Sequence, residues 1–329
     1  MPRLLQRIAL DFGEFEMRIG FEDSTEIFNQ PQSQLFSLFL KRRKATVFEK
    51  RKKIPTFASM YDQDVILDQK LFSEYLRFVF LEAGITHHPL LRLEVYVNVA
   101  SNAPQTTKQL WVHILESLGV SSVTLCANAI SCAVGAGFSF PIPSFALLIH
   151  LGYSRSEVAG VSFTQCLFSK DLEFSGDKIR SNLEAEIFRI YGKELTASFW
   201  EKLLSSVGGF LPQAQKGVNH SEYLSFLDEV SSTWQIPEEF LIEKISQAAS
   251  MMTTQLLLTL EELSADELSS CVSNGIVLTG GLAKAEGVAS YLSSMLHMPV
   301  YPASEPDVSA IRGVVSLMQE LSSGNDVAK

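Results

Sequence analysis

The chain has 329 residues, of which 46% are hydrophobic and 19% charged, a balance typical of folded globular proteins and not of disordered ones. Its length allows two ordinary domains. The formal net charge of −10 argues against a nucleic-acid-binding surface that covers the whole protein. The four cysteines have neither CxxC nor metal-ligand spacing, which predicts reduced thiols in the core of a cytoplasmic protein: Cys126, Cys132, Cys166 and Cys271.

The sequence contains no run that approaches the roughly 20 apolar residues of a membrane-spanning helix. The first residues also lack the apolar core of a signal peptide. Leu4, Leu5 and Ile8, with Arg3 and Arg7, give only a trace of an amphipathic membrane-binding helix. We therefore expect the protein to stay in the cytoplasm.

Apolar runs that end at glycines or polar turns predict the strands of an α/β protein, with helices between several of them. The expected strands cover residues 7–11, 14–21, 93–100, 123–126, 145–152, 157–163 and 275–279. The expected helices cover residues 104–118, 128–137 and 284–296, and most of residues 177–262 is also expected to be helical. In the first of these helices, the spacing places Trp111, Ile114, Leu115 and Leu118 on one face.

Eight of the 27 basic residues fall within thirteen positions: Lys41, Arg42, Arg43, Lys44, Lys50, Arg51, Lys52 and Lys53. A solvated loop or hairpin is one interpretation of this basic segment. A surface that binds anionic lipid headgroups is a second, because each basic residue near such a membrane adds about 1 kcal/mol of attraction. Binding to nucleic acid is a third.

Common catalytic motifs are missing: the sequence has no GxGxxG, GxxxxGK[ST], HExxH or GxSxG. Instead, three predicted strands end in glycine turns, at Asp11–Gly13, His150–Gly152 and Thr279–Gly281. Two such turns could bind a phosphate chain through backbone N–H groups, and the third could let the backbone approach an adenosine closely.

These turns, in this order, resemble those of the MreB-like bacterial actins in the actin-like ATPase superfamily. The most specific stretch is GIVLTGGLAKAEGVASYLSSMLHMPVYPASEPDVSAIRGVVSL, at residues 275–317. The stretch ALDFGEFEMRIG is similar to the first phosphate segment of that family, and residues 93–162 are similar to its connecting and second phosphate segments. The resemblance covers most of the chain in collinear order.

The resemblance implies a two-lobed actin-like ATPase fold, in which each lobe is an RNase H-like α/β domain and a cleft separates the lobes. Domain I would comprise residues 1–141 and 305–329, with a small basic subdomain at about 30–62, and domain II residues 142–304. The implied cofactors are ATP and Mg²⁺, with Asp11 holding the metal through water. The implied nucleotide-binding residues are Asp11, Gly13, Gly152, Arg155, Gly176, Asp177, Glu201, Gly280, Gly281, Leu282 and Ala283.

Several positions depart from the family pattern. The first phosphate loop, expected to be rich in Gly, Thr and Asn, reads Glu14-Phe15-Glu16-Met17, and its carboxylates would repel a polyphosphate unless a cation intervenes. His150 stands where a metal-side aspartate is expected, and Leu204 where a lysine is expected. The glutamate that positions the attacking water is replaced at Ala127 and Asn128, so we expect ATPase activity to be weak or lost and assign no catalytic residue.

The resemblance therefore implies a divergent cytoskeletal filament protein of cell-shape determination and cell-wall growth, at the inner face of the membrane. It would self-associate or assemble together with a complete MreB, touch anionic lipid through the basic segment, and bind no nucleic acid. One alternative is a non-hydrolysing adaptor that binds a partner filament or division component. Another is a small-molecule kinase or other phosphotransferase of the same superfamily.

Overall fold

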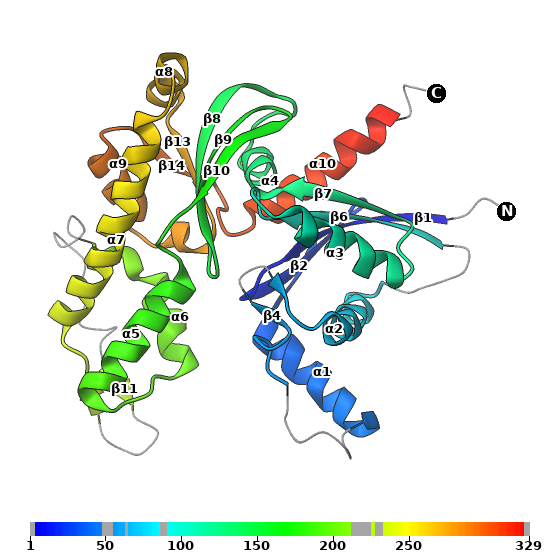
Figure 1. The fold of residues 1–329 in the computed structure, drawn as a ribbon, viewed down its shortest axis with the longest axis horizontal. Helices are drawn as coiled ribbons and strands as arrows, with labels where there is room; N and C mark the ends of the chain where they lie inside the picture. Colours follow the sequence, from blue (N-terminus) through cyan, green and yellow to red (C-terminus); the bar gives the residue numbers. More distant parts are fainter. Residues whose placement is uncertain are drawn as a thin grey trace. The chain divides into compact units, whose positions relative to one another are not determined.

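The computed structural model describes residues 4–47, 55–62, 65–85, 91–211, 225–227 and 233–325. The chain divides into two compact units: residues 1–140 with 310–329 form unit 1, and residues 141–309 form unit 2. In each unit helices are built around a five-stranded sheet, and each sheet contains parallel and antiparallel neighbours (Figure 1). The mixed α/β class predicted from the sequence is confirmed.

The sheet of unit 1 has the order β3-β2-β1-β6-β7. The neighbours β1–β6 and β6–β7 pair in parallel, whereas β1–β2 and β2–β3 pair antiparallel. Its strands are β1 (Leu4–Phe12), β2 (Glu16–Phe21), β3 (Ile27–Pro31), β6 (Leu91–Val99) and β7 (Ser122–Ala127). The helices are α1 (Gln32–Val47), α2 (Gln69–Glu82), α3 (Gln105–Ser117), α4 (Asn128–Gly135) and α10 (Ser309–Asn325), and a short hairpin joins β4 (Tyr61–Asp62) to β5 (Val65–Ile66).

Aromatic side chains fill the core of unit 1 at the carboxyl end of β1. The ring centroid of Phe12 lies 4.9 Å from that of Phe72 on α2 and 5.8 Å from that of Trp111 on α3. The α3 face predicted from spacing is buried, with Trp111, Ile114, Leu115 and Leu118 each at most 4% exposed. This packing fixes the position of the glycine turn that follows Phe12.

The sheet of unit 2 has the order β10-β9-β8-β13-β14. Its strands are β8 (Ile142–Leu151), β9 (Ser156–Phe163), β10 (Gln165–Asp171), β13 (Ile276–Thr279) and β14 (Val300–Pro302), and a separate hairpin pairs β11 (Ser225–Leu227) with β12 (Thr233–Gln235). The helices are α5 (Gly176–Tyr191), α6 (Ala197–Ser205), α7 (Glu238–Glu261), α8 (Ala265–Asn274) and α9 (Val288–Leu296), with 3-10 turns η1 (Val207–Phe210) and η3 (Gly281–Lys284).

Some element boundaries differ from those predicted. The N-terminal residues from Leu4 form a strand, so the trace of an amphipathic helix there is wrong. The helix expected to start at Lys284 begins instead at Val288, because Gly287 before it is in the left-handed region with a φ of 96°. Residues 212–224, within the region expected to be mostly helical, lie outside the described residues.

The cysteines form no disulfide: all four are free thiols, and Cys166 is half-buried while the other three are buried. Within the described ranges, none of the helices combines the length and the apolar character that crossing a membrane requires.

Candidate nucleotide-binding site

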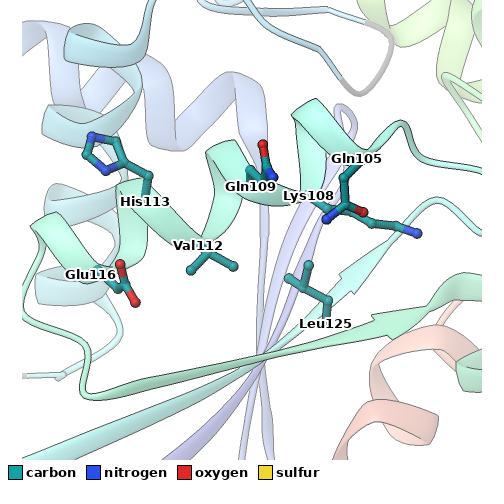
Figure 2. A pocket seen from close by; sticks show the side chains of 7 residues that line it. All are labelled: Gln105, Lys108, Gln109, Val112, His113, Glu116 and Leu125. Atoms are coloured by element: carbon teal, nitrogen blue, oxygen red, sulfur yellow. The ribbon is translucent and has the colours of Figure 1, made fainter.

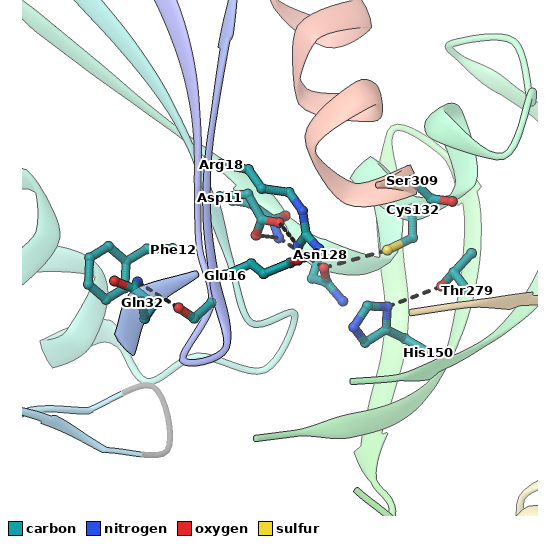
Figure 3. A network of polar contacts seen from close by, with 12 residues as sticks. Asp11, Phe12, Glu16, Arg18, Gln32, Asn128, Cys132, His150, Thr279 and Ser309 are labelled. Carbon is teal, nitrogen blue, oxygen red and sulfur yellow. Dashed lines mark hydrogen bonds and ion pairs between the residues drawn. The ribbon is translucent and has the colours of Figure 1, made fainter. Parts of the chain in front are cut away.

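The predicted metal ligand Asp11 lies one residue before the end of β1, between Arg18 of β2 and Asn98 of β6. Asn98 Nδ2 donates a hydrogen bond of 3.0 Å to Asp11 Oδ1. Arg18 Nη1 lies 3.4 Å from Asp11 Oδ2, and the two side chains are 12% and 14% exposed, respectively. Both carboxylate oxygens of Asp11 therefore have partners from neighbouring strands of the same sheet (Figure 3).

Arg18 also reaches Glu16, the carboxylate expected to repel a polyphosphate. Its Nη2 atom pairs with Glu16 Oε2, two residues earlier on the same strand. One guanidinium is thus shared between two carboxylates, and the group keeps a net charge of −1. The cation beside the first glycine turn is supplied by the chain itself.

Residues Gly13–Glu16 form a turn, here called the Gly13 turn, that hydrogen bonds hold closed. The Gly13 N–H donates to the Glu16 carbonyl at 3.1 Å. The buried side chain of Gln32 donates through Nε2 to the Gly13 carbonyl at 2.7 Å and accepts at 2.5 Å from the Tyr75 hydroxyl. Burial raises the pKa of Tyr75, so this hydroxyl keeps its proton and remains a donor.

The positions at which the resemblance predicts the water-orienting glutamate carry no carboxylate. Ala127 ends β7 and Asn128 begins α4. Asn128 Oδ1 accepts a 2.9 Å hydrogen bond from Asn98 Nδ2 and a 3.5 Å contact from the Cys132 thiol. An amide with no titratable proton cannot act as a general base, so the structure offers no group at this position to activate water.

In unit 2, the polar groups in and beside the turn after β8 are hydrogen-bonded to other residues of the same unit. The Gly152 N–H donates to the Arg155 carbonyl at 3.0 Å and to Ser156 Oγ at 3.2 Å. The Arg155 guanidinium forms a salt bridge with Asp171, with Nε 2.7 Å from Oδ1. His150, at the expected metal-side position, makes a 3.1 Å hydrogen bond between Nδ1 and Thr279 Oγ1. The group predicted to clamp phosphate is therefore already paired with a carboxylate.

The predicted pair Gly176 and Asp177 opens α5 beside this turn. The Gly176 N–H donates to the Gly152 carbonyl at 3.1 Å, and the Asp177 N–H to the Tyr153 carbonyl at 2.7 Å. A β-carbon on Gly176 would lie 2.9 Å from the Tyr153 ring. Close packing against Tyr153 explains this glycine without a ligand.

The two glycines of the turn after β13 differ in the space around them: Gly280 is closely packed, and Gly281 has free space beside it. Gly280 has a φ of 93°, and a β-carbon there would lie 2.3 Å from the Leu151 carbonyl oxygen. A β-carbon on Gly281 would meet no atom within 4 Å among the described residues. Leu282 and Ala283 are buried in the core of unit 2. Gly281 is thus the position in this turn where an adenosine could approach the backbone.

Glu201, the predicted ribose contact, is exposed on α6, and α6 contacts the 3-10 turn at Gly281–Lys284. Leu204 on the same helix is buried in the core, which explains why a leucine stands where the family pattern has a lysine. Unit 2 therefore places Gly152, Gly176, Gly280 and the α6 helix around one end of its sheet.

The residues present do not fit a magnesium ion at Asp11. Mg²⁺ requires oxygen ligands in near-octahedral geometry, whereas both Asp11 oxygens are engaged and a fixed guanidinium lies beside them. No group of three or more His, Cys, Asp or Glu side chains in the described part of the chain could hold a metal ion. The fit to a nucleoside is better, because Gly281 leaves its side of the turn open.

A separate open pocket of about 270 Å³ lies over α3 and the edge strand β7 (Figure 2). Six residues of α3 and one of β7 line it: Gln105, Lys108, Gln109, Val112, His113, Glu116 and Leu125. It contains none of the predicted nucleotide-binding residues.

Part of the basic segment lies on α1, which packs against α2. Arg42 pairs with Glu82 at 2.6 Å, and Arg43 pairs with Glu74 at 3.0 Å, with only 11% of the Arg43 side chain exposed. Lys41 is exposed on α1, but the side chain of Lys44 and all of Lys50, Arg51, Lys52 and Lys53 lie outside the described residues. Two of the eight basic residues are thus neutralised by carboxylates of unit 1.

Three residues that complete the first turn were not predicted from the sequence: Arg18, Gln32 and Asn98. The signal for Arg18 was available, because a tight hairpin places it opposite Asp11 and on the same side of its strand as Glu16. Gln32 gave no such signal, since it reaches the turn only through tertiary packing.

Comparison with known proteins identifies the family. The MreB/Mbl protein family matches residues 39–325. The cell shape-determining protein MreB of Escherichia coli K12 is 20% identical over 250 residues, which are 76% of this chain and 71% of that protein. The cell shape-determining protein Mbl of Bacillus subtilis is 24% identical over 227 residues, which are 68% of this chain and 66% of that protein.

Solved structures show the same fold. MreB5 of Spiroplasma citri, crystallised bound to ADP, superposes with a TM-score of 0.78 at 17% identity and 99% coverage of both chains. A MamK double helical filament superposes with a TM-score of 0.71 at 12% identity, covering 96% of this chain and 99% of MamK. These similarities confirm the predicted actin-like fold, and the family match over residues 39–325 shows that the chain belongs to the MreB/Mbl family.

Proposed function

We propose that this chain is a cytoskeletal protein of cell-shape determination that self-associates into actin-like filaments and does not depend on efficient ATP hydrolysis. The observation that carries the proposal is the family match over residues 39–325, since relatives in that family are named cell shape-determining proteins. The similarity to a MamK filament over 96% of the chain supports self-association.

Two features of the expected phosphate site support weak hydrolysis. The positions of the water-orienting carboxylate hold Ala127 and Asn128, and His150 replaces a carboxylate on the metal side. Phosphoryl transfer is catalysed mainly by positioning of the reactants and by charge stabilisation. Without both carboxylates, most of this rate acceleration would be lost. Nucleotide binding itself is supported by the open face of Gly281, and MreB5 has been crystallised with ADP and with AMPPNP.

The filaments would assemble on the inner face of the membrane, attracted to anionic lipid by Lys41, Lys44, Lys50, Arg51, Lys52 and Lys53. Arg42 and Arg43 contribute less, because Glu82 and Glu74 balance their charges. Surface attraction of this kind acts within about a Debye length of the membrane and weakens with salt.

Electron microscopy of the purified full chain on anionic lipid, with and without Mg-ATP, tests the proposal. Filaments in both conditions are the expected result. Filaments with Mg-ATP but none with Mg-AMPPNP, a non-hydrolysable analogue, would overturn the independence from hydrolysis. An absence of filaments alone, combined with binding to filaments of a complete MreB, would overturn self-association in favour of an adaptor.

A further inference from the structure

We propose that the Arg18 guanidinium is a resident cation of the Gly13 turn: it takes the place beside Asp11 at which an actin-like ATPase would hold a hydrated metal ion, and the turn needs no metal. This inference goes beyond the proposed function, because it concerns unit 1 alone and holds whether or not the chain forms filaments.

The position of Arg18 is set by the sheet and not by a mobile loop. Arg18 and Asp11 are directly opposite each other in the antiparallel register of β1 and β2. Met17 and Ile19, on either side of Arg18 along β2, are fully buried in the core of unit 1. The strand is therefore anchored through this face, and its opposite face presents Arg18 to Asp11.

The local charges favour a resident cation over a bound one. Without Arg18, Asp11 and Glu16 would place two negative charges at the turn, which is an arrangement that attracts a divalent cation. With Arg18 paired to both, a metal would have to displace the guanidinium from Asp11 and then remain close to its positive charge. Repulsion between fixed like charges is strong where solvent screening is limited, as it is around two side chains that are 12% and 14% exposed.

The local charges also argue against an anion as the natural partner of Arg18. Its Nε atom is buried and has no hydrogen-bond partner among the described residues, so one donor remains unused. However, Asp11 and Glu16 together exceed its charge by one, and the net negative charge repels a phosphate. Arg18 therefore balances the turn and does not serve as a phosphate receptor.

The rest of unit 1 holds the turn closed without a ligand. Gln32 binds the turn twice: its N–H donates to the Phe15 carbonyl at 2.9 Å, and its side chain donates to the Gly13 carbonyl at 2.7 Å. Tyr75 on α2 fixes the Gln32 amide through a 2.5 Å hydrogen bond. Two helices and one strand thus determine the shape of a segment that phosphate and metal would otherwise order.

Binding of Mn²⁺, a paramagnetic substitute for Mg²⁺, tests the proposal by electron paramagnetic resonance of the free ion. The readout is Asp11-dependent binding, defined as the difference between each protein and the same protein with Asp11→Asn. The full-length wild-type chain is expected to show none up to about 1 mM Mn²⁺. Arg18→Met is expected to gain a site with a Kd of about 0.1 mM or below, at least about tenfold tighter than the limit set for the wild type. This site should disappear in the Asp11→Asn, Arg18→Met double variant.

Arg18→Lys is the matched control: it keeps the positive charge and should gain no site. Arg18→Gln, which keeps a polar side chain, replaces Arg18→Met if circular dichroism shows that the methionine variant does not fold. Asp11-dependent Mn²⁺ binding by the wild type would overturn the proposal. A folded neutral variant that gains no Asp11-dependent site would also overturn it, because Arg18 would then not be what excludes the metal.

Discussion

The backbone of Gly313 on α10 touches that of Ser131 on α4 so closely that a β-carbon at position 313 would lie 1.7 Å from the Ser131 carbonyl oxygen. On the opposite side of this helix, Val315 lies against Gly20 of β2, where a β-carbon would be 2.3 Å from Val315 Cγ2. Gly313 and Gly20, which have no β-carbon, therefore allow α10 to pack closely between α4 and β2. These contacts join α10 to the rest of unit 1.

Replacing Gly313 by alanine should destabilise unit 1. The clash is with backbone, which cannot rotate away, so the two helices must separate; overpacking of this kind costs about 1–3 kcal/mol. Thermal unfolding should show the loss as a lower melting temperature. Gly281→Ala is the matched control, because its β-carbon would meet no atom among the described residues and should leave the melting temperature unchanged. Equal melting temperatures for the two variants would contradict the contact.

Gly281→Val should remove nucleotide binding while unit 2 stays folded. The valine side chain would fill the open side of the turn where we expect adenosine to lie, so affinity for a fluorescent ADP analogue should fall by at least about tenfold. The measurement is fluorescence titration, paired with circular dichroism. By contrast, Gly280→Val should unfold unit 2, because Gly280 has a φ of 93° and touches Leu151. Unchanged affinity in Gly281→Val would show that the nucleoside does not bind at this turn.

Much of the fold was predictable because its strongest signals are local. Val95, Val97 and Val99 alternate along β6, and Trp111, Ile114 and Leu115 recur at helical spacing, so strand and helix could be distinguished from periodicity alone. The short strands β11 and β12 were missed within a region expected to be helical, because three-residue strands carry no measurable period.

For the candidate site, the sequence predicted where the backbone turns lie but not which side chains contact them. Gly13, Gly152 and Gly280 could be placed at strand ends, because glycine turns after apolar runs are visible in sequence. Their hydrogen-bond partners could not, since the pairs Gly13–Gln32 and Gly152–Ser156 depend on how side chains meet in space. The sequence also does not show that the Gly13 N–H donates to the Glu16 carbonyl and the Gly152 N–H to the Arg155 carbonyl, so both N–H groups were expected to be available for phosphate.

Stability should decline above pH 9 in a manner that depends on Cys126. Burial raises the pKa of this thiol from 9.0 to about 12. Below pH 9 both states keep the proton, whereas at higher pH only the unfolded state releases it, so unfolding becomes easier. Between about pH 8 and pH 10 the expected contribution is about 1.4 kcal/mol of unfolding free energy. Urea unfolding at the two pH values should show a smaller drop in Cys126→Ala than in Cys166→Ala, and equal drops would contradict the assignment.

Replacing Lys50, Arg51, Lys52 and Lys53 by serine should weaken binding to anionic liposomes, and the wild-type binding should itself fall as salt rises. Each basic residue near the lipid surface contributes about 1 kcal/mol, so the loss for four should exceed about tenfold in co-sedimentation. The matched control removes four charges elsewhere, through serine at Lys70, Lys108, Lys193 and Lys202. A general electrostatic effect would weaken both variants equally and would contradict a localised lipid-binding segment. The double variant Arg42→Ser, Glu82→Gln should change binding little, because the ion pair that it removes, at 2.6 Å, carries no net charge.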